Sequence, residues 1–157
     1  MKITDKYVFF YNDEFSQWHR ASMVIDDITY NCAEQYMMHQ KALLFNDSNT
    51  AKLIMSAEIP RSQKALGRSV ANFNQRLWDR RCLSIVYRGN LAKFSQNTEL
   101  KKLLLSLGDR FFVEASEHDT IWGIGLNEFS AIDNPIMWQG TNLLGTVLTM
   151  VRNELKE

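Results

Sequence analysis

Residues 31–45, NCAEQYMMHQKALLF, form the segment that decides most about how this chain folds. They are typical of one helix, which residues 46–47 bring to an end. Glu34 lies in its first turn. With Asn31 as the N-cap residue, Glu34 would occupy position N3 and complete a capping box, a purely structural role. The same position also suits an ionised carboxylate that activates water or stabilises a positive sugar carbon, because Lys41 follows two turns later on the same face.

The composition is that of an ordinary globular protein. Of the 157 residues, 45% are apolar and 23% are charged, which is enough for one domain with its own core. The sequence has no run of about 18 apolar residues, so we expect no membrane span. The first residues lack the apolar stretch of a signal peptide. We therefore expect a single domain over residues 1–157, located in the cytoplasm.

Charge and motif content narrow the classes of function. The 18 basic and 18 acidic residues balance, which disfavours non-specific binding to nucleic acid or membranes but leaves room for a local phosphate pocket. Cys32 and Cys82 form no CxxC pair, and we expect both to be reduced and buried. The three histidines have no metal-ligand spacing, so the sequence predicts no metal. Glycine motifs for nucleotides and the serine nucleophile elbow are also missing, and we expect no cofactor.

The order of predicted elements favours the α+β class, predominantly helical with a small β-sheet. Strands and helices do not alternate along the chain as they do in a doubly wound sheet. Runs of β-forming residues predict strands at 7–11, 21–25, 28–30, 111–115 and 120–125. Apolar spacing and helix-end signals predict helices at 31–45, 50–57, 60–67, 75–94 with an interruption near Gly89, 99–107 and 143–155.

Two further segments carry unusual residues. Residues 119–125, DTIWGIG, combine an acid, a tryptophan and two glycines, and glycines in a strand often mark close approach by a ligand. A twisted edge strand with a core tryptophan explains this segment equally well. In residues 138–145, Gly140 precedes a helix start whose free N–H groups would suit an anion, although a plain capped helix is an equal alternative.

Taken together, the motifs resemble the NADAR family, which includes the YbiA-like N-glycosidases. The resemblance covers nearly the whole chain, from Phe10 to about Glu154. The helix with the Ala33-Glu34 pair is similar to the family's most recognisable motif, although Gln35 replaces a common histidine. The other matching strings, in the family's order, are residues 10–16, 65–68, Trp78, 89–94, 119–125 and 138–145.

This resemblance implies a YbiA-like fold and a hydrolase acting on N-glycosyl bonds at C1′ of a ribose phosphate. In one branch the substrates are ribosylaminopyrimidine phosphates, which are unstable intermediates of riboflavin biosynthesis. In another the substrate is ADP-ribose attached to guanine, with contact to ADP-ribosylated nucleic acid. A non-catalytic module that binds ADP-ribose or a nucleotide is the alternative from another class. We expect no membrane partner, and the oligomeric state is not predicted.

The resemblance also implies roles for individual residues. Glu34 would stabilise the oxocarbenium ion or act as the base toward water, and Asp119 would hold ribose hydroxyls or share that duty. The predicted substrate-binding residues fall into three groups by chemistry: tryptophans that stack on the leaving base, cations that contact phosphate, and amides that position the substrate. They are Trp78, Trp122 and Trp138; Lys41, Arg68 and Lys93; and Asn12 and Asn90.

Overall fold

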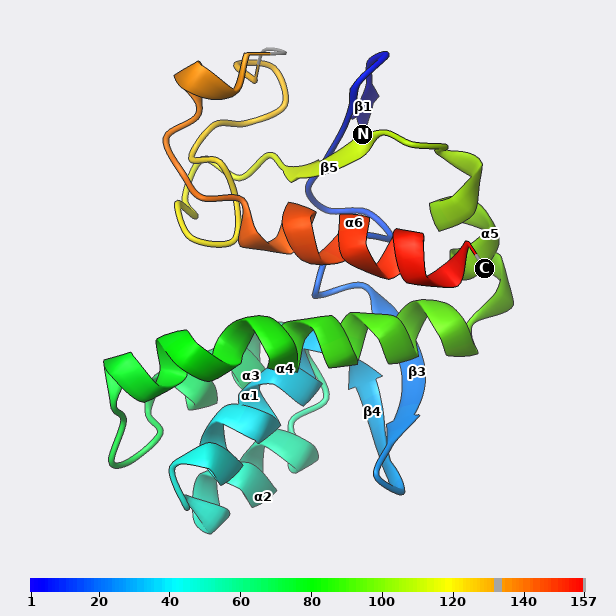
Figure 1. Cartoon of the computed structure of the whole chain (residues 1–157). Coiled ribbons are helices and arrows are strands. Elements are labelled where there is room, and N and C mark those ends of the chain that lie inside the picture. Colours follow the sequence, from blue (N-terminus) through cyan, green and yellow to red (C-terminus); the bar gives the residue numbers. More distant parts are fainter. Residues whose placement is uncertain (132–133, 157) are drawn as a thin grey trace. The chain divides into compact units, whose positions relative to one another are not determined.

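The computed structural model describes residues 1–131 and 134–156 (Figure 1). Its elements are helices with a few short strands, so the α+β prediction is confirmed. The chain divides into two compact units, one made of Met1–Ser16 and Thr98–Glu157, the other of Gln17–Asn97. Each unit is described by itself below.

The first unit is built on a small mixed sheet. Its strands are β1 (Lys2–Ile3), β2 (Tyr7–Phe10) and β5 (Phe111–Glu114), in the order β1-β2-β5. The pair β1 and β2 is antiparallel, whereas β2 and β5 run parallel with Phe9 opposite Val113. Such a parallel pair needs a long connection, and here more than half of the chain separates the two strands.

Two helices complete this unit, α5 (Thr98–Ser106) and α6 (Leu143–Leu155), and a 3₁₀ turn, η1 (Pro135–Met137), precedes α6. The apolar stripe predicted for α6 is confirmed, because Leu144, Leu148 and Val151 are fully buried. Helix α6 packs on β5 so closely that a side chain at Gly145 would collide with the Phe112 carbonyl.

The second unit opens with a hairpin of β3 (Arg20–Ile25) and β4 (Ile28–Cys32), drawn as neighbouring arrows in Figure 1. Asp26 and Asp27 connect the strands with φ angles of 51° and 64°. Positive φ at both central residues is the geometry of a type I′ turn, whose twist matches the strands. The predicted hairpin is therefore confirmed at its Asp-Asp turn.

Four helices form the rest of this unit: α1 (Ala33–Leu44), α2 (Ser48–Ser56), α3 (Pro60–Arg68) and α4 (Gln75–Gln96). Helix α1 is the central one, since it contacts α2, α3 and α4. The predicted interruption near Gly89 is wrong, because α4 continues through it. Gly89 is instead a contact point, where an added Cβ would lie 2.6 Å from Cδ1 of Tyr36.

The strand predicted at 120–125 is also wrong, since these described residues form bends. Their carbonyl groups serve another purpose. The main-chain N–H groups of residues 141–144 donate to the carbonyls of residues 120–123 over 2.9–3.1 Å. The same bonds occupy N–H groups at the start of α6, so the helix-end anion site considered for residues 138–145 does not form. The plain capped helix does not form either, because Asn142, the N-cap residue of α6, makes no side-chain cap hydrogen bond within the described chain.

Candidate functional site

Glu34 is the second residue of α1 and is only 6% exposed. The predicted capping box is wrong. The N-cap residue is Cys32, one position later than expected, and it makes no side-chain cap hydrogen bond within the described chain. The N–H of Asn31 donates to Oε1 of Gln35 over 2.8 Å, so Gln35 performs the reaching-back role that the sequence assigned to Glu34. A capping box therefore does not explain a carboxylate at position 34.

The main chain around Glu34 is held from several sides. Its own N–H donates to the carbonyl of Gln17 over 3.0 Å. Gln35, the next residue, also donates from Nε2 to the Ile54 carbonyl at the end of α2 over 3.2 Å. These bonds fix the first turn of α1, from which the Glu34 side chain extends, against two other segments of the same unit.

A second buried amide, Gln63, ties α3 to the same helix start. Its Nε2 donates to Oδ1 of Asn31 over 3.1 Å and to the Ala57 carbonyl over 2.8 Å, while its Oε1 accepts from Sγ of Cys32 over 3.1 Å. Gln63 is fully buried. This role could not be predicted from the residue type, because a single glutamine in a helix is usually a surface residue.

The charge of Glu34 acts on the pKa values of Lys41 and of the Cys32 thiol. Burial lowers the pKa of Lys41, the Glu34 charge raises it and the Arg68 charge lowers it. Burial raises the pKa of the Cys32 thiol to about 11; the Glu34 charge adds to this shift and the Lys93 charge opposes it. Lys93 is fully buried in α4. Among the predicted residues, Glu34 therefore interacts with Lys41, Arg68 acts on Lys41, and Lys93 acts on the thiol on which Glu34 also acts.

Trp78 belongs to the same unit and is 9% exposed. The ammonium group of Lys41 lies 5.6 Å from the centre of the Trp78 ring and 4.7 Å from that of Phe73. Cation–π contact lets an aromatic face hold a lysine without a carboxylate partner. Trp78 thereby positions a cation that Glu34 also attracts, and its predicted stacking on a leaving base remains a prediction.

Asn90 is fully buried in α4, and its Nδ2 donates to Oε1 of Gln17 over 2.8 Å and to the Val86 carbonyl over 2.9 Å. Gln17 is the residue whose carbonyl accepts from Glu34. The predicted positioner Asn90 is therefore linked to the predicted catalytic residue through one intermediate side chain. Sequence reasoning missed Gln17, since 73 positions separate it from Asn90.

The other predicted residues lie in the first unit. Asp119 is half-buried, and its Oδ1 accepts from the N–H groups of Ile121 and Trp122 over 2.9 and 2.8 Å. This turn shapes the loop and leaves the second carboxylate oxygen for other partners. Trp122 is half-buried beside it, and Asn12 is exposed after β2. The substrate-binding roles of these residues stay predictions.

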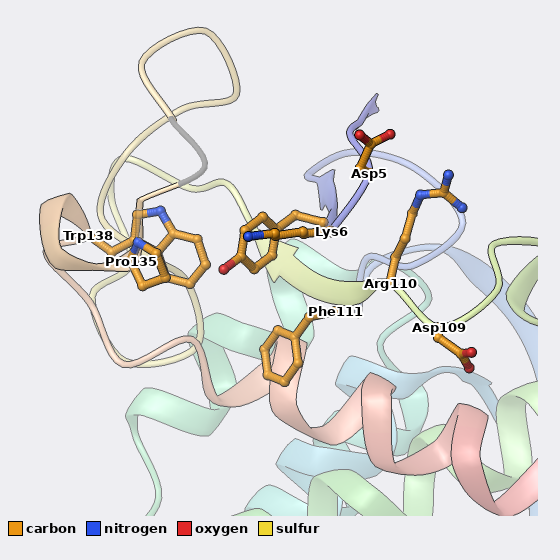
Figure 2. Close-up of a pocket in the computed structure, with 8 residues that line it drawn as sticks. Asp5, Lys6, Asp109, Arg110, Phe111, Pro135 and Trp138 are labelled. Carbon is orange, nitrogen blue, oxygen red and sulfur yellow. The ribbon is translucent and has the colours of Figure 1, made fainter.

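Trp138 forms part of a pocket of about 650 Å³ in the first unit (Figure 2). Its ring meets those of Tyr7 and Phe9 edge-on, with centroids 5.4 and 6.3 Å apart. The Trp138 ring therefore has a packing role. Its predicted stacking on a base would use the part of the ring that does not contact Tyr7 and Phe9. The pocket is lined by Asp5, Lys6, Tyr7, Asp109, Arg110, Phe111, Pro135 and Trp138.

The described residues, 1–131 and 134–156, contain no group of three His, Cys, Asp or Glu residues that could hold a metal ion. Within the same residues, no helix combines the length and the apolar character that crossing a membrane requires.

The fold and the site define a small α+β protein with a fixed, nearly buried carboxylate at a helix start, among cations and amides. The chain belongs to the NADAR domain family, whose model matches residues 9–156. It is similar to N-glycosidase R617 of Acanthamoeba polyphaga mimivirus, with 45% identity covering 96% of this chain and 97% of the relative.

Two other comparisons extend this result. The NMR structure of the E. coli protein YbiA superposes with a TM-score of 0.79 at 26% identity, covering 99% of this chain and 88% of that one. A more distant relative, 26% identical, is a riboflavin biosynthesis protein of Vibrio vulnificus; the match covers 99% of this chain but 40% of the relative. The predicted family and the YbiA-like fold are confirmed.

Proposed function

We propose that this chain hydrolyses the C1′–N bond of a ribosyl phosphate, and that its substrates are ribosylaminopyrimidine phosphates, the intermediates of riboflavin biosynthesis. The observation that carries the proposal is Glu34, a buried carboxylate in the first turn of α1, a turn that hydrogen bonds from the Glu34 main chain and the Gln35 side chain hold in place.

The enzyme class rests on family membership. A mimiviral relative that matches this chain almost end to end is named an N-glycosidase. The chain is accordingly a hydrolase acting on N-glycosyl bonds. A pure binding module would gain little from a buried carboxylate near an anionic ligand, whereas hydrolysis requires one.

The reaction assigns Glu34 a definite task. Water adds its oxygen to C1′ while the C1′–N bond breaks, the bonding electrons leave with the nitrogen, and that nitrogen takes up a proton. Positive charge develops on C1′ and the ring oxygen, as in O-glycoside hydrolysis. A carboxylate close to C1′ stabilises this charge or accepts the proton of the attacking water.

The cations around Glu34 support a phosphorylated substrate. Lys41 is half-buried against the Phe73 and Trp78 rings, and Arg68 is exposed at the last turn of α3. Ammonium and guanidinium groups are the usual partners of phosphate. The riboflavin assignment draws further support from the distant Vibrio vulnificus relative, whose name refers to that pathway.

The test is a mass-spectrometric assay of two substrates with one preparation of the purified chain. We expect the ribosylaminopyrimidine phosphate to yield free aminopyrimidine and ribose phosphate. Release of ADP-ribose from an ADP-ribosylated guanine oligonucleotide alone would keep the enzyme class and overturn the proposed substrate. Tight binding of ADP-ribose in calorimetry, without cleavage of either substrate, would contradict the proposed hydrolase activity and favour a binding module.

A further inference from the structure

Two amide side chains beside Glu34 have hydrogen-bonding atoms that the protein does not use. Among the described residues, Nε2 of Gln17 and Oδ1 of Asn90 are buried and have no hydrogen-bond partner. Buried polar atoms are nearly always bonded, because an unmade bond leaves their lost hydration uncompensated. Two such atoms on adjacent side chains therefore need an explanation.

The remaining atoms of both amides are fully engaged. Asn90 has two N–H groups, which donate to Oε1 of Gln17 and to the Val86 carbonyl. Gln17 accepts that bond and also accepts the Glu34 N–H at its main-chain carbonyl. These contacts hold both side chains in one orientation. What they leave over is the Nε2 group of Gln17, which carries two N–H donors, and the acceptor Oδ1 of Asn90.

A hydroxyl group matches this pair, since it can donate one hydrogen bond and accept another. The position of Gln17 and Asn90 in the structure indicates which substrate hydroxyl they would bind. Gln17 is bonded directly to the main chain of Glu34, the residue assigned to C1′ of the substrate. On a ribosyl substrate, the hydroxyl adjacent to C1′ is the 2′-hydroxyl.

We propose that Gln17 and Asn90 determine sugar specificity by binding the 2′-hydroxyl of the substrate, with Gln17 Nε2 donating to it and Asn90 Oδ1 accepting from it. This inference rests on the proposed N-glycosidase function. It gives the chain a preference for ribosyl over 2′-deoxyribosyl substrates. A site built to bond a hydroxyl rejects an analogue that lacks it, because its own polar atoms then stay unpaired.

Gln17→Glu is the sharpest variant. A glutamate keeps an oxygen to accept from Asn90 but replaces the unused donor with a second acceptor. We expect kcat/KM for the ribosyl substrate to fall about 10- to 100-fold. The same kcat/KM measurement on the 2′-deoxy analogue, with the same base and phosphate, gives the ratio of the two values, which is the sugar preference. We expect the wild-type preference to shrink at least tenfold, whatever the added charge does to both substrates.

Gln17→Met introduces no charge and also removes the donor, and it should shrink the preference for the ribosyl substrate in the same way. Gln96→Met is the matched control, because Gln96 lies in the same unit but both ends of its amide are bonded to Val24. It should leave the preference unchanged. Rates are corrected for uncatalysed hydrolysis, and thermal unfolding shows that each variant is folded.

The outcomes separate this inference from the proposed function. A wild-type chain that cleaves neither sugar contradicts the N-glycosidase function itself. A wild-type chain that cleaves the ribosyl substrate, with a ribose preference that both Gln17 variants retain, overturns the specificity assignment alone. Equal loss on both sugars in both variants also overturns it, because it indicates a purely structural amide pair.

Discussion

Glu34 illustrates how neighbours decide what a residue does. The Asn31 N–H that it was expected to accept is bound by Gln35 instead, and Gln17 accepts its main-chain N–H. Gln35, one position later, accepts the hydrogen bond from Asn31. The capping box suggested by the spacing therefore does not explain the carboxylate at position 34. The same first turn buries Cys32, and this thiol reports on the environment of the carboxylate.

The pH dependence of stability gives a prediction at this scale. Burial raises the pKa of Cys32 from 9.0 to about 11, so the folded protein keeps the thiol protonated where the unfolded chain loses the proton. The contribution of this pKa shift to the free energy of unfolding is complete below pH 9 and is lost as the pH rises toward 11. The free energy of unfolding then falls by roughly 1.4 kcal/mol per pH unit at most. Chemical denaturation between pH 8 and pH 11 measures it.

Cys32→Ala should flatten that slope relative to the wild type, whatever it costs in absolute stability. Cys82 serves as the comparison, since burial also raises the pKa of its thiol. If the slopes of wild type and Cys32→Ala coincide over this range, the Cys32 environment is not as described.

At the scale of elements, α1 is positioned by close helix contacts. An added Cβ at Gly89 of α4 would lie 2.6 Å from Cδ1 of Tyr36, and one at Gly67 of α3 would collide with Met38. Both glycines stand in strings that carried the family resemblance. Their role in this chain is to let two helices approach α1 and thereby hold the helix that presents Glu34.

Gly89→Ala tests this packing. In an exposed helix the change would stabilise by about 1 kcal/mol, because alanine is the better helix former. Here the contact with the Tyr36 ring must be relieved, and overpacking costs typically 1–3 kcal/mol. We expect a net loss of stability in urea denaturation. Ser84→Ala, on an exposed position of the same helix, should be close to neutral, and stabilisation by Gly89→Ala would contradict the contact.

At the scale of the whole molecule, local pattern predicted most elements and few of the contacts. The stripe of α6 and the hairpin at Asp26-Asp27 follow from periodicity and turn chemistry, which act between near neighbours. The strand expected at 120–125 failed because β-forming residues there use their carbonyls to bind the start of α6. That choice depends on residues about twenty positions away.

The candidate site was predictable to the same extent. Glu34, Lys41 and Lys93 were expected and share one neighbourhood. The amides that bond the residues at the start of α1, Gln17 and Gln63, were missed because their partners are distant in sequence and a glutamine does not signal burial. The single domain expected over residues 1–157 stays a prediction, and the structure divides the chain into two compact units.

The central claim is that hydrolysis depends on the negative charge of the Glu34 side chain. Glu34→Gln tests it most directly, because the variant keeps the size of the side chain and removes its charge. Glu58→Gln is the matched control, an exposed glutamate of the same unit. With the ribosylaminopyrimidine phosphate, we expect Glu34→Gln to lower kcat by about 10²- to 10⁴-fold with an unfolding midpoint near that of the wild type, and Glu58→Gln to change neither. A folded Glu34→Gln variant that turns over at the wild-type rate would contradict the account.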